Sequence, residues 1–277
     1  MTDDAEAMNQ QYGATDISVR ILTHLRQAGV DLEALTREDL AAFDEFHGGG
    51  QESTRALGRL AKLEPRMRVL DLGCGIGGPA RTLAAEFGCQ ITGIELTYEF
   101  YRAAEMLTAK VGLSHLVQFR HGDAVAMPFD DAAFDVVWSQ NSLMNIADKV
   151  SLLRQIHRVL RAGGRFAFQT MLAGPVPNLH FPVFWADTAA LNFLVTPEEL
   201  RRLLRRTGFH EVVWEDMTAR TIAMAQQRRK VVAHEGTPAL GIGVIVPAQA
   251  HEKTANALRN YEEGRTVAVQ AVYAKAV

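Results

Sequence analysis

The sequence predicts an α/β protein built on one doubly wound, seven-stranded sheet with helices on both faces. Short apolar runs rich in β-branched residues alternate with amphipathic helical patterns along most of the chain. The first buried run ends in four glycines within six positions, and a helical pattern follows at once. Such alternation is typical of a mainly parallel sheet, because parallel strands need a crossover connection, usually a helix.

The N-terminal region is predicted to be helical. Residues 16–28 place apolar side chains on one helical face, and Gly29 closes this segment. A second helix is predicted to start at Thr36, with Asp39 as a capping-box-like acid. Three consecutive glycines, 48–50, then precede an amphipathic helix over 53–63. These glycines form either a flexible hinge or a lid that closes over the charged end of a cofactor.

The remaining strands and helices follow from periodicity and from breaker residues. Seven strands are predicted over 67–72, 91–94, 117–121, 134–139, 165–169, 210–214 and 266–274. Helices are predicted between them, over 80–87 and 98–111, from about 152 to Gly163-Gly164, and from an N-cap at Thr196 to Gly208.

Two insertions interrupt this pattern. Residues 175–187 are rich in proline and aromatic side chains, and they form either a flap over its own apolar cluster or a lid over a substrate pocket. Residues 218–264 form a cap or a dimer surface. We therefore divide the chain into an N-terminal helical lid segment (1–64), a core (65–217) with a lid insertion at about 172–195, a cap insertion (218–264) and a last core strand (265–277).

Composition narrows the classes of partner. The net charge of −3 argues against nucleic acid, and the basic run over 201–206 lies opposite leucines, as a solvated helix face does. The two cysteines, Cys74 and Cys89, predict neither a disulfide framework nor a metal site, so we expect a reducing, cytoplasmic compartment. The N-terminus lacks an apolar targeting segment, and no long apolar run predicts a membrane span. A monomer or a homodimer is expected.

The glycine turn at 73–78 fits two classes of cofactor. It satisfies G-x-G-x-x-G, the dinucleotide fingerprint, with Glu95 at the end of the next strand as the ribose-binding acid. It also closely resembles Asp-x-Gly-x-Gly-x-Gly, the first motif of class I S-adenosylmethionine (SAM) methyltransferases. The turn alone does not decide between them.

The positions of the polar residues favour SAM. Ligands of doubly wound sheets lie across the carboxyl ends of the strands, and Asp71, Glu95, Asp123 and 139–141 each follow one of the first four strands. SAM needs a carboxylate for its ribose diol, an acceptor for its adenine amino group and an acceptor for its ammonium group. A nicotinamide-dependent reductase of the short-chain type would usually add Tyr-x-x-x-Lys, which none of the five tyrosines forms.

Further motifs extend the resemblance to the small-molecule class I SAM-dependent methyltransferases, which include the sterol, tocopherol, ubiquinone and phosphoethanolamine enzymes. The matching stretches are 69–78, 122–124 with 128–129, 134–139 and 160–164. The chain is most similar to the sarcosine and dimethylglycine N-methyltransferases. Phe46-His47 with Gly49-Gly50 and Thr54 resembles their Phe-His-x-Gly-Gly, and Ser139-Gln140-Asn141 resembles their Ser-Gln-Asp.

This resemblance implies roles for particular residues. Glu95 would bind the ribose diol, and Asp123 with Ala124 would face the adenine. Gly73 and Gly75 would let the methionine part approach, with Gln140 and Gly49 near its amino-acid end or the sulfonium. The predicted cofactor site is completed by Asp71, Cys74, Leu96 and Ser139. Asn141 stands where the family has aspartate, which removes a carboxylate that could hold a cationic amine and argues against a glycine-type acceptor.

The expected reaction is an in-line displacement that moves a methyl group to a small-molecule acceptor and leaves S-adenosylhomocysteine. A tertiary amine needs no base and would suit an aromatic cage formed by Phe181, Phe184 and Trp185. An oxygen or carbon nucleophile, as in natural products, lipids or quinones, would need a base, for which His47 and His180 are the candidates. Amine N-methylation is favoured, and no metal is expected. Two further classes of function stay open, a nicotinamide-dependent oxidoreductase and a SAM-binding protein without methyl transfer.

Overall fold

The computed structural model describes residues 17–45, 47–236, 238–246 and 248–276. Its centre is a seven-stranded sheet with the order β3-β2-β1-β4-β5-β7-β6. The strands are β1 (Arg68–Leu72), β2 (Gln90–Glu95), β3 (Val117–His121), β4 (Phe134–Gln140), β5 (Leu160–Ala173), β6 (Phe209–Asp216) and β7 (Thr266–Lys275). The first five run parallel, and β7 runs antiparallel to both β5 and β6.

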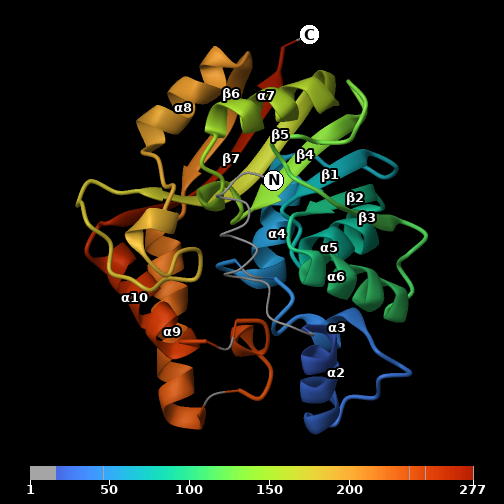
Figure 1. Cartoon of the computed structure of the whole chain (residues 1–277), viewed down its shortest axis with the longest axis vertical. Helices are drawn as coiled ribbons and strands as arrows, with labels where there is room; N and C mark the ends of the chain where they lie inside the picture. The colour runs from blue at the N-terminus through green and yellow to red at the C-terminus, as the bar shows by residue number, and fades with distance from the viewer. Residues whose placement is uncertain (1–16, 46, 237, 247, 277) are drawn as a thin grey trace.

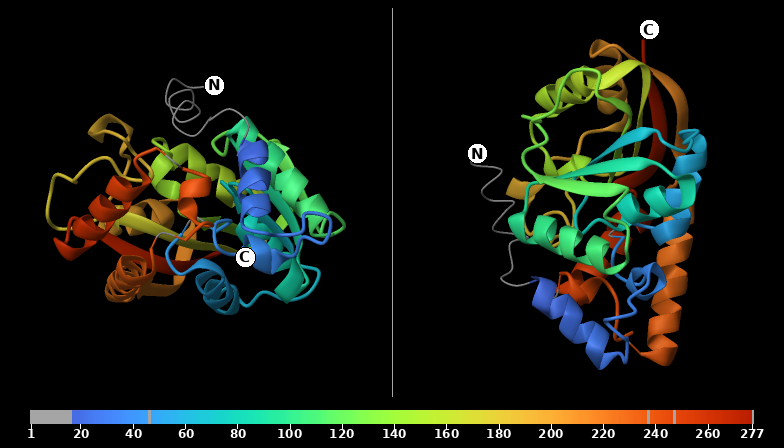
Figure 2. Two further views of the ribbon diagram at one scale, coloured as in Figure 1. Left: turned by 90° about the horizontal axis from the view of Figure 1, so that it is seen from below. Right: turned by 90° about the vertical axis from the view of Figure 1, so that its right-hand side faces the viewer.

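Helices cover both faces of the sheet (Figures 1 and 2). On one face, α7 (Lys149–Val159) and α8 (Pro197–Arg206) bury Leu152, Ile156 and Leu200 against the strands. On the other face lie α4 (Gly50–Leu60), α5 (Gly78–Phe87) and α6 (Tyr98–Lys110). This three-layer arrangement buries apolar side chains on both sides of the central strands, which explains why these strands are apolar almost throughout.

The N-terminal helices pack against the outside of α6 rather than against the sheet. α2 (Ile17–Gln27) and the short α3 (Arg37–Leu40) share an apolar cluster with α6 and with Val244 and Ile245 of the cap insertion. Arg20 of α2 also donates to the backbone oxygens of Val244, at 2.6 Å, and Ile245, at 2.8 Å. Two segments more than 200 residues apart are therefore held together.

The two insertions also meet each other. The first contains η2 (Ala189–Leu191), and the second contains α9 (Thr218–Glu235), η3 (Ile242–Val244) and α10 (Ala250–Glu262). Val183, Trp185 and Ala186 of the first insertion pack with Tyr261 of α10 and with Met144 of η1 (Leu143–Asn145), the turn after β4. None of the helices in the described part of the chain is long and apolar enough to cross a membrane.

The predicted fold class and all seven strands are confirmed, with three corrections to the element boundaries. The helix expected to run to Gly163-Gly164 ends at Val159, because Leu160 is extended and pairs with Phe134, so β5 begins directly there. β5 also continues to Ala173, so the lid insertion begins after that residue. The capping box expected at Thr36 and Asp39 is present. The helix expected over 53–63 instead begins at Gly50, with Gly49 as its N-cap, and ends at Leu60.

Candidate active site

The glycine turn joins β1 to α5. Gly73, Gly75 and Gly77 have φ values of 67°, 55° and 84°, which favour glycine. At Gly73 there is also no room for a side chain, because a Cβ would lie 2.4 Å from the Cβ of Ser142. The backbone N–H groups of Gly73 and Cys74 donate to Ile94 O of β2, which fixes the turn against the neighbouring strand end.

Glu95 is the buried acid at the end of β2. Its Oε2 accepts from the backbone N–H of Gly75 at 2.9 Å, and its Oε1 accepts from that of Thr97 at 2.8 Å. Burial raises the pKa of Glu95, and these two hydrogen bonds oppose the increase. A carboxylate oxygen can accept more than one hydrogen bond, so the oriented carboxylate keeps the capacity to accept from a diol.

Asp71 is a buried carboxyl group without a complete set of partners. It lies in β1, two residues before Gly73, and its Oδ2 has no hydrogen-bond partner among the residues that the structure describes. Burial, together with the charges of Glu45 and Glu95, raises the pKa of Asp71 to about 8. Three carboxyl groups therefore interact beside the glycine turn, and a bound cation would relieve their repulsion.

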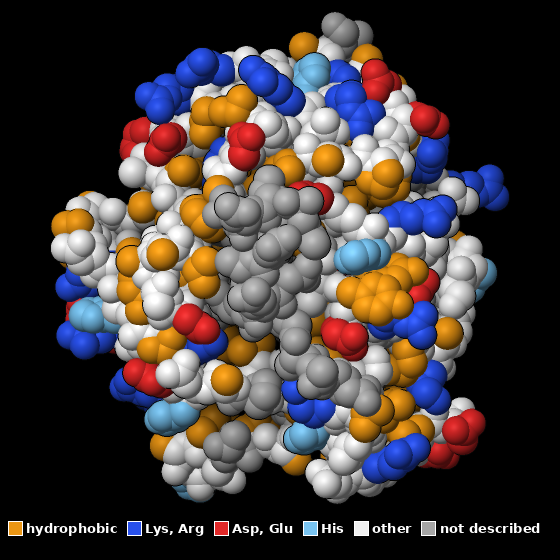
Figure 3. Space-filling model, in the orientation of Figure 1, with side chains coloured by type: hydrophobic (Ala, Val, Ile, Leu, Met, Phe, Trp, Pro, Cys, Tyr) orange, Lys and Arg blue, Asp and Glu red, His pale blue; other side chains and the backbone are white. Residues whose placement is uncertain are grey.

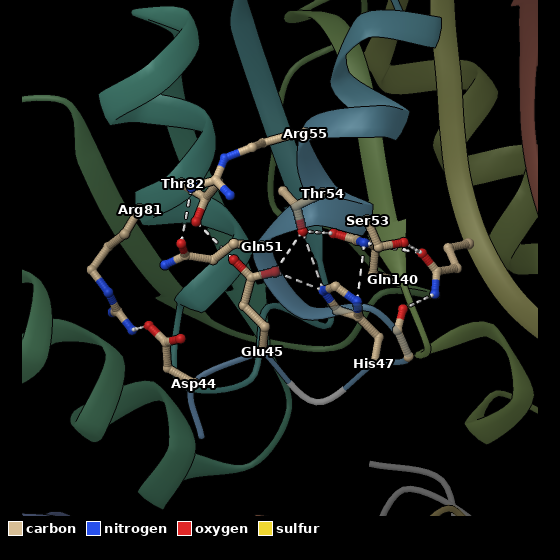
Figure 4. Close-up of polar contacts among 12 residues, drawn as sticks. Asp44, Glu45, His47, Gln51, Ser53, Thr54, Arg55, Arg81, Thr82 and Gln140 are labelled. Carbon is tan, nitrogen blue, oxygen red and sulfur yellow. Dashed lines mark hydrogen bonds and ion pairs between the residues drawn. The ribbon is translucent and has the colours of Figure 1, made fainter. Parts of the chain in front are cut away.

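A polar network lies where the segment before α4 meets β4 and β5. It consists of Glu45, His47, Thr54 and Gln140, which Figure 4 shows, together with Gln169 of β5. Nε2 of His47 lies 3.0 Å from Oε2 of Glu45, and both side chains are almost completely buried. The hydroxyl of Thr54 lies 2.6 Å from the same carboxylate oxygen and 3.0 Å from Oε1 of Gln140. The network joins the segment before α4 to the two central strands.

The direction of the hydrogen bonds in this network follows from Trp138. Its indole N–H can only donate, and it lies 2.9 Å from Oε1 of Gln140, so the amide nitrogen of Gln140 must face the other way. That nitrogen lies 3.5 Å from Nδ1 of His47 and 3.4 Å from Oε1 of Gln169. Nδ1 of His47 is thus on the accepting side, and Nε2 carries the hydrogen that points to Glu45.

This arrangement shows how His47, one of the two predicted candidates for a general base, is held in the protein. A proton accepted at Nδ1 would point at the Gln140 NH₂ group, which Trp138 holds in place. The side chain is also only 2% exposed. His47 therefore holds the segment before α4 against β4. In this state the lone pair of its Nδ1 is directed at the Gln140 amide and not at a bound acceptor.

Glu45 extends the network to α5. Burial alone would raise the pKa of Glu45, but hydrogen bonds from His47, Thr54 and Thr82 hold it below its usual value. The preceding residue, Asp44, forms a buried ion pair with Arg81 of α5 at 3.0 Å. A Cβ at Gly78 would lie 2.0 Å from Asp44 O, so only glycine allows this segment to lie on the start of α5.

The other residues predicted to bind the cofactor lie at the expected strand ends, but several already have partners in the protein. Ser139 is fully buried, and its hydroxyl lies 2.6 Å from that of Ser142. Asp123 accepts from Val125 N in the turn after β3, and Ala124 packs on the core below it. Leu96 O faces His121 Nε2 at 2.9 Å. These contacts leave their roles toward a cofactor as predictions.

Three further predicted residues have unusual surroundings. The buried Cys74 thiol lies under the turn, where a Cβ at Gly93 would lie 2.7 Å from its sulfur, and burial raises its pKa well above the usual value. Asn141 has a φ of 53° and donates its backbone N–H to Gln169 O. Gly49, with a φ of 96°, is the N-cap of α4. Phe46, part of the resemblance to the N-methyltransferases, lies outside the described residues.

The predicted lid residues are divided between packing and contacts to α10. Trp185 is 1% exposed and donates to Asn192 Oδ1, so it is a core residue of the lid and not the wall of an open cage. Phe181 packs against the same cluster, whereas Phe184 is half-buried and outside it. His180 lies 2.8 Å from Glu263 at the end of α10, so its ring contacts that helix and is not part of the polar network.

Sequence reasoning missed four polar residues at this site: Glu45, Thr54 as a network member, Gln169 and Gln270. Gln169 and Gln270 pair directly across β5 and β7, and the Gln270 amide donates to Oε1 of Gln169 at 3.0 Å. Gln169 in turn donates to Gly48 O at 3.0 Å. The available signal was a glutamine directly after a short apolar run in each strand, 166–168 in β5 and 267–269 in β7.

The class of protein follows from this geometry. A parallel 3-2-1-4-5 order, a glycine turn after β1 and a buried acid after β2 are the features of Rossmann-like, nucleoside-binding folds. The site edge is acidic and is not a pyrophosphate cradle, because Glu45, Asp71 and Glu95 all interact there. This charge fits a cationic cofactor better than a dinucleotide.

Comparisons with known proteins agree with this class. Residues 70–168 match the model of a methyltransferase domain family. The chain is 35% identical over 172 residues to a sarcosine/dimethylglycine N-methyltransferase from Halorhodospira halochloris. This alignment covers 60% of this chain and 61% of that enzyme. It is 38% identical over 130 residues to the 27-O-demethylrifamycin SV methyltransferase from Amycolatopsis mediterranei, covering 46% of this chain and 48% of that enzyme. Phosphoethanolamine and tocopherol methyltransferases also match.

Among solved structures, the [4+2]-cyclase SpnF matches over 100% of this chain and 98% of its own, at 26% identity and a TM-score of 0.68. Residues 70–168 therefore match a methyltransferase domain, and the chain is similar to several class I SAM-dependent methyltransferases. The aligned part of the chain spans less than two thirds of the length of the Halorhodospira and Amycolatopsis relatives, 61% and 48%.

Proposed function

We propose that this protein transfers a methyl group from SAM to a small-molecule acceptor, with an amine nitrogen as the favoured acceptor atom. The observation that carries the proposal is the pair of buried carboxyl groups beside the glycine turn. Glu95 is oriented by two backbone N–H groups, and Asp71 has an oxygen without a partner in the described part of the chain. A diol and a positively charged group on one ligand match this pair.

The residues present fit SAM. In this proposal Glu95 accepts from the ribose hydroxyls, and Asp123 with Ala124 lies beside the adenine. The glycines at 73 and 75 leave space at the backbone for the methionine part, whose ammonium Asp71 would attract. Bound SAM supplies a methyl group on a sulfonium sulfur. The neutral thioether that remains after transfer is a good leaving group.

The protein's own part in the reaction would be positioning and the exclusion of water. Correct orientation of two reactants can lower a barrier by about 7 to 11 kcal/mol. The segment before α4 is fixed to α5 through Asp44 and Glu45, and Gly49 lies near Met224 of α9. These contacts support a site enclosed between the N-terminal segment and the cap insertion.

An acceptor that needs no base is consistent with the state of the two predicted bases. Nδ1 of His47 faces the Gln140 amide, and His180 is paired with Glu263. A tertiary amine has its own lone pair, so it can attack without losing a proton. The similarity to a sarcosine/dimethylglycine N-methyltransferase supports the same choice, whereas the relative that acts on a rifamycin supports O-methylation as the alternative.

The test is an assay of S-adenosylhomocysteine release over a panel of secondary and tertiary amines, phenols and quinones. We expect turnover with at least one tertiary amine, without a dependence on His47 as a base. Turnover only with phenols or quinones would replace amine transfer by O- or C-transfer. Titration of the protein with SAM and with NAD in parallel decides the cofactor, and binding of NAD alone would overturn the proposal.

A second candidate is a SAM-binding protein that catalyses a rearrangement without methyl transfer. The observation that favours it is the match to SpnF, a [4+2]-cyclase, over the whole length of both chains. Tight SAM binding with no S-adenosylhomocysteine released from any member of the panel would favour this second candidate over methyl transfer.

A further inference from the structure

A cavity lies at the opposite edge of the sheet from the glycine turn. Its volume is about 590 Å³, and it is lined by Asp131, Ala132, Val150, Arg154, His157, Arg158, Leu203, Arg206, Thr207 and Lys275. β4 and β5 begin at this edge and the antiparallel β7 ends there, whereas the glycine turn follows the carboxyl end of β1. The cavity is therefore separate from the candidate active site.

Two helix faces form the walls. Val150, Arg154 and His157 lie on one side of α7, at intervals of three or four residues. Leu203 and Arg206 lie on one side of α8. α7 and α8 are neighbours on the same face of the sheet. Lys and Arg side chains lie along the upper edge of the molecule, where these two helices are found (Figure 3). The cavity thus combines apolar wall residues with cations from both helices.

Two of the basic side chains that line the cavity, Arg158 and Lys275, already form hydrogen bonds within the protein. Arg158 donates to Asp131 at 2.8 Å and to the backbone oxygens of Phe129 and Met127. Lys275 donates to His157 O and Leu160 O, both at 2.7 Å. Asp131, the acid that lines the cavity, is therefore neutralised, and the last carbonyls of α7 are capped.

Arg154 and Arg206 form no such hydrogen bonds to the residues that the structure describes. Both are exposed, and neither has an ion pair within 4.0 Å among the residues that the structure describes. Basic side chains near a helix C-terminus often only offset the helix dipole, but Lys275 already occupies the carbonyls at the end of α7, and Thr207 Oγ1 occupies Leu203 O of α8. The two arginines are left facing a cavity of the size that small ligands use.

We propose that this cavity binds a small organic anion that carries a phosphate or diphosphate group. Guanidinium groups bind phosphate oxygens in pairs of parallel hydrogen bonds, and Arg154 and Arg206 approach the cavity from two different helices. Val150 and Leu203 provide an apolar contact for the organic part. This proposal does not depend on methyl transfer.

The test uses inorganic pyrophosphate and phenyl phosphate as probes, titrated up to about 5 mM by calorimetry at low salt. We expect the unaltered protein to bind at least one of them. The double variant Arg154→Gln/Arg206→Gln should weaken that binding by about tenfold or more, since it removes two charged donors. Phenyl phosphate binding tighter than pyrophosphate identifies the apolar wall as part of the site, and the reverse order identifies charge as the main contribution.

The matched control is Arg229→Gln/Lys230→Gln, which removes the same charge from the exposed α9. Binding should persist in this control, and circular dichroism should show that both double variants remain folded. The proposal is overturned if neither probe binds the unaltered protein, if binding survives in the α7/α8 variant, or if the control loses as much affinity as that variant.

Discussion

Buried charge is the main feature of the site at the scale of single residues. Asp71, Glu45 and Glu95 interact beside the glycine turn, and Glu45 has three side-chain donors whereas Asp71 has an unpartnered oxygen. The three carboxyl groups therefore respond differently to burial: the pKa of Glu45 is lowered, and those of Asp71 and Glu95 are raised. The increase in the pKa of Asp71 should therefore be measurable in the protein without a ligand.

The first prediction concerns the stability of the free protein against pH. The pKa of Asp71 rises from 3.8 to about 8 on folding, so between these values the folded state binds more protons than the unfolded state. Stability due to this group is therefore lost as the pH rises through that window, by at most about 1.4 kcal/mol per pH unit. Urea denaturation should give a shallower fall for Asp71→Asn than for the unaltered protein, and equal slopes would contradict the assignment.

The second prediction concerns the tautomer of His47. Trp138 fixes the Gln140 amide, so His47 should carry its hydrogen on Nε2 and keep Nδ1 as the acceptor. Nitrogen chemical shifts of the ring, measured by NMR, distinguish the two tautomers and should show this one. The variant Gln140→Glu replaces the NH₂ group beside Nδ1 by an acceptor oxygen and should therefore favour a hydrogen on Nδ1. A hydrogen on Nδ1 in the unaltered protein would contradict this assignment, because Nε2 would then hold the lone pair and could accept a proton.

At the scale of elements, one face of α10 holds the lid insertion. Lys253 lies 2.7 Å from Asp187, Asn256 donates to Pro182 O at 3.0 Å, and Asn260 both accepts from His180 N and donates to His180 O. These three residues lie on one helical face, so the lid and the cap insertion form one unit. Access to the site by opening of the lid alone would break all of these contacts.

The third prediction follows from this contact. Asn260→Ala removes both hydrogen bonds to the backbone of His180, so amide hydrogen exchange across residues 178–187 should become faster. Glu252→Ala, on the exposed side of α10, is the matched control and should leave exchange in the lid unchanged. Unchanged exchange in Asn260→Ala would show that the apolar cluster around Trp185 holds the lid without these hydrogen bonds.

The elements show which parts of the fold could be predicted from the sequence. All seven strands are found, because buried strands of a doubly wound sheet are apolar runs bounded by breakers. The end of α7 could not be predicted, since a helix can pass directly into a strand at Leu160 with no breaker between them. The pairing of Gln169 with Gln270 depends on the register of β5 and β7, which periodicity does not contain.

The site residues divide in the same way. Glu95 and the glycine turn could be located because they are adjacent in sequence to the ends of predicted strands. The surroundings of His47 and Trp185 depend on side chains far away in the sequence, namely Gln140 for the first, and Met144 and Tyr261 for the second. Their side-chain types indicated catalysis and a cage, but their contacts indicate positioning and packing.

At the scale of the whole molecule, the site lies where three separate segments meet the carboxyl edge of the sheet. The segment before α4 closes on α5 through Asp44 and Glu45, α9 approaches the glycines at 48 and 49, and the lid insertion is tied to α10. Arg20 joins the N-terminal helix to the cap insertion. These contacts bring the three segments together at this edge of the sheet, while the cavity between α7 and α8 lies at the other edge.

The most direct test of the central claim is calorimetric titration with SAM. The unaltered protein should bind SAM, and Glu95→Ala should lose at least about tenfold in affinity, because a buried carboxylate that accepts from the ribose hydroxyls is removed. Asp130→Ala, an exposed acid in the loop after β3, should bind as the unaltered protein does. No detectable binding of SAM, or the same affinity in Glu95→Ala and Asp130→Ala, would contradict the account.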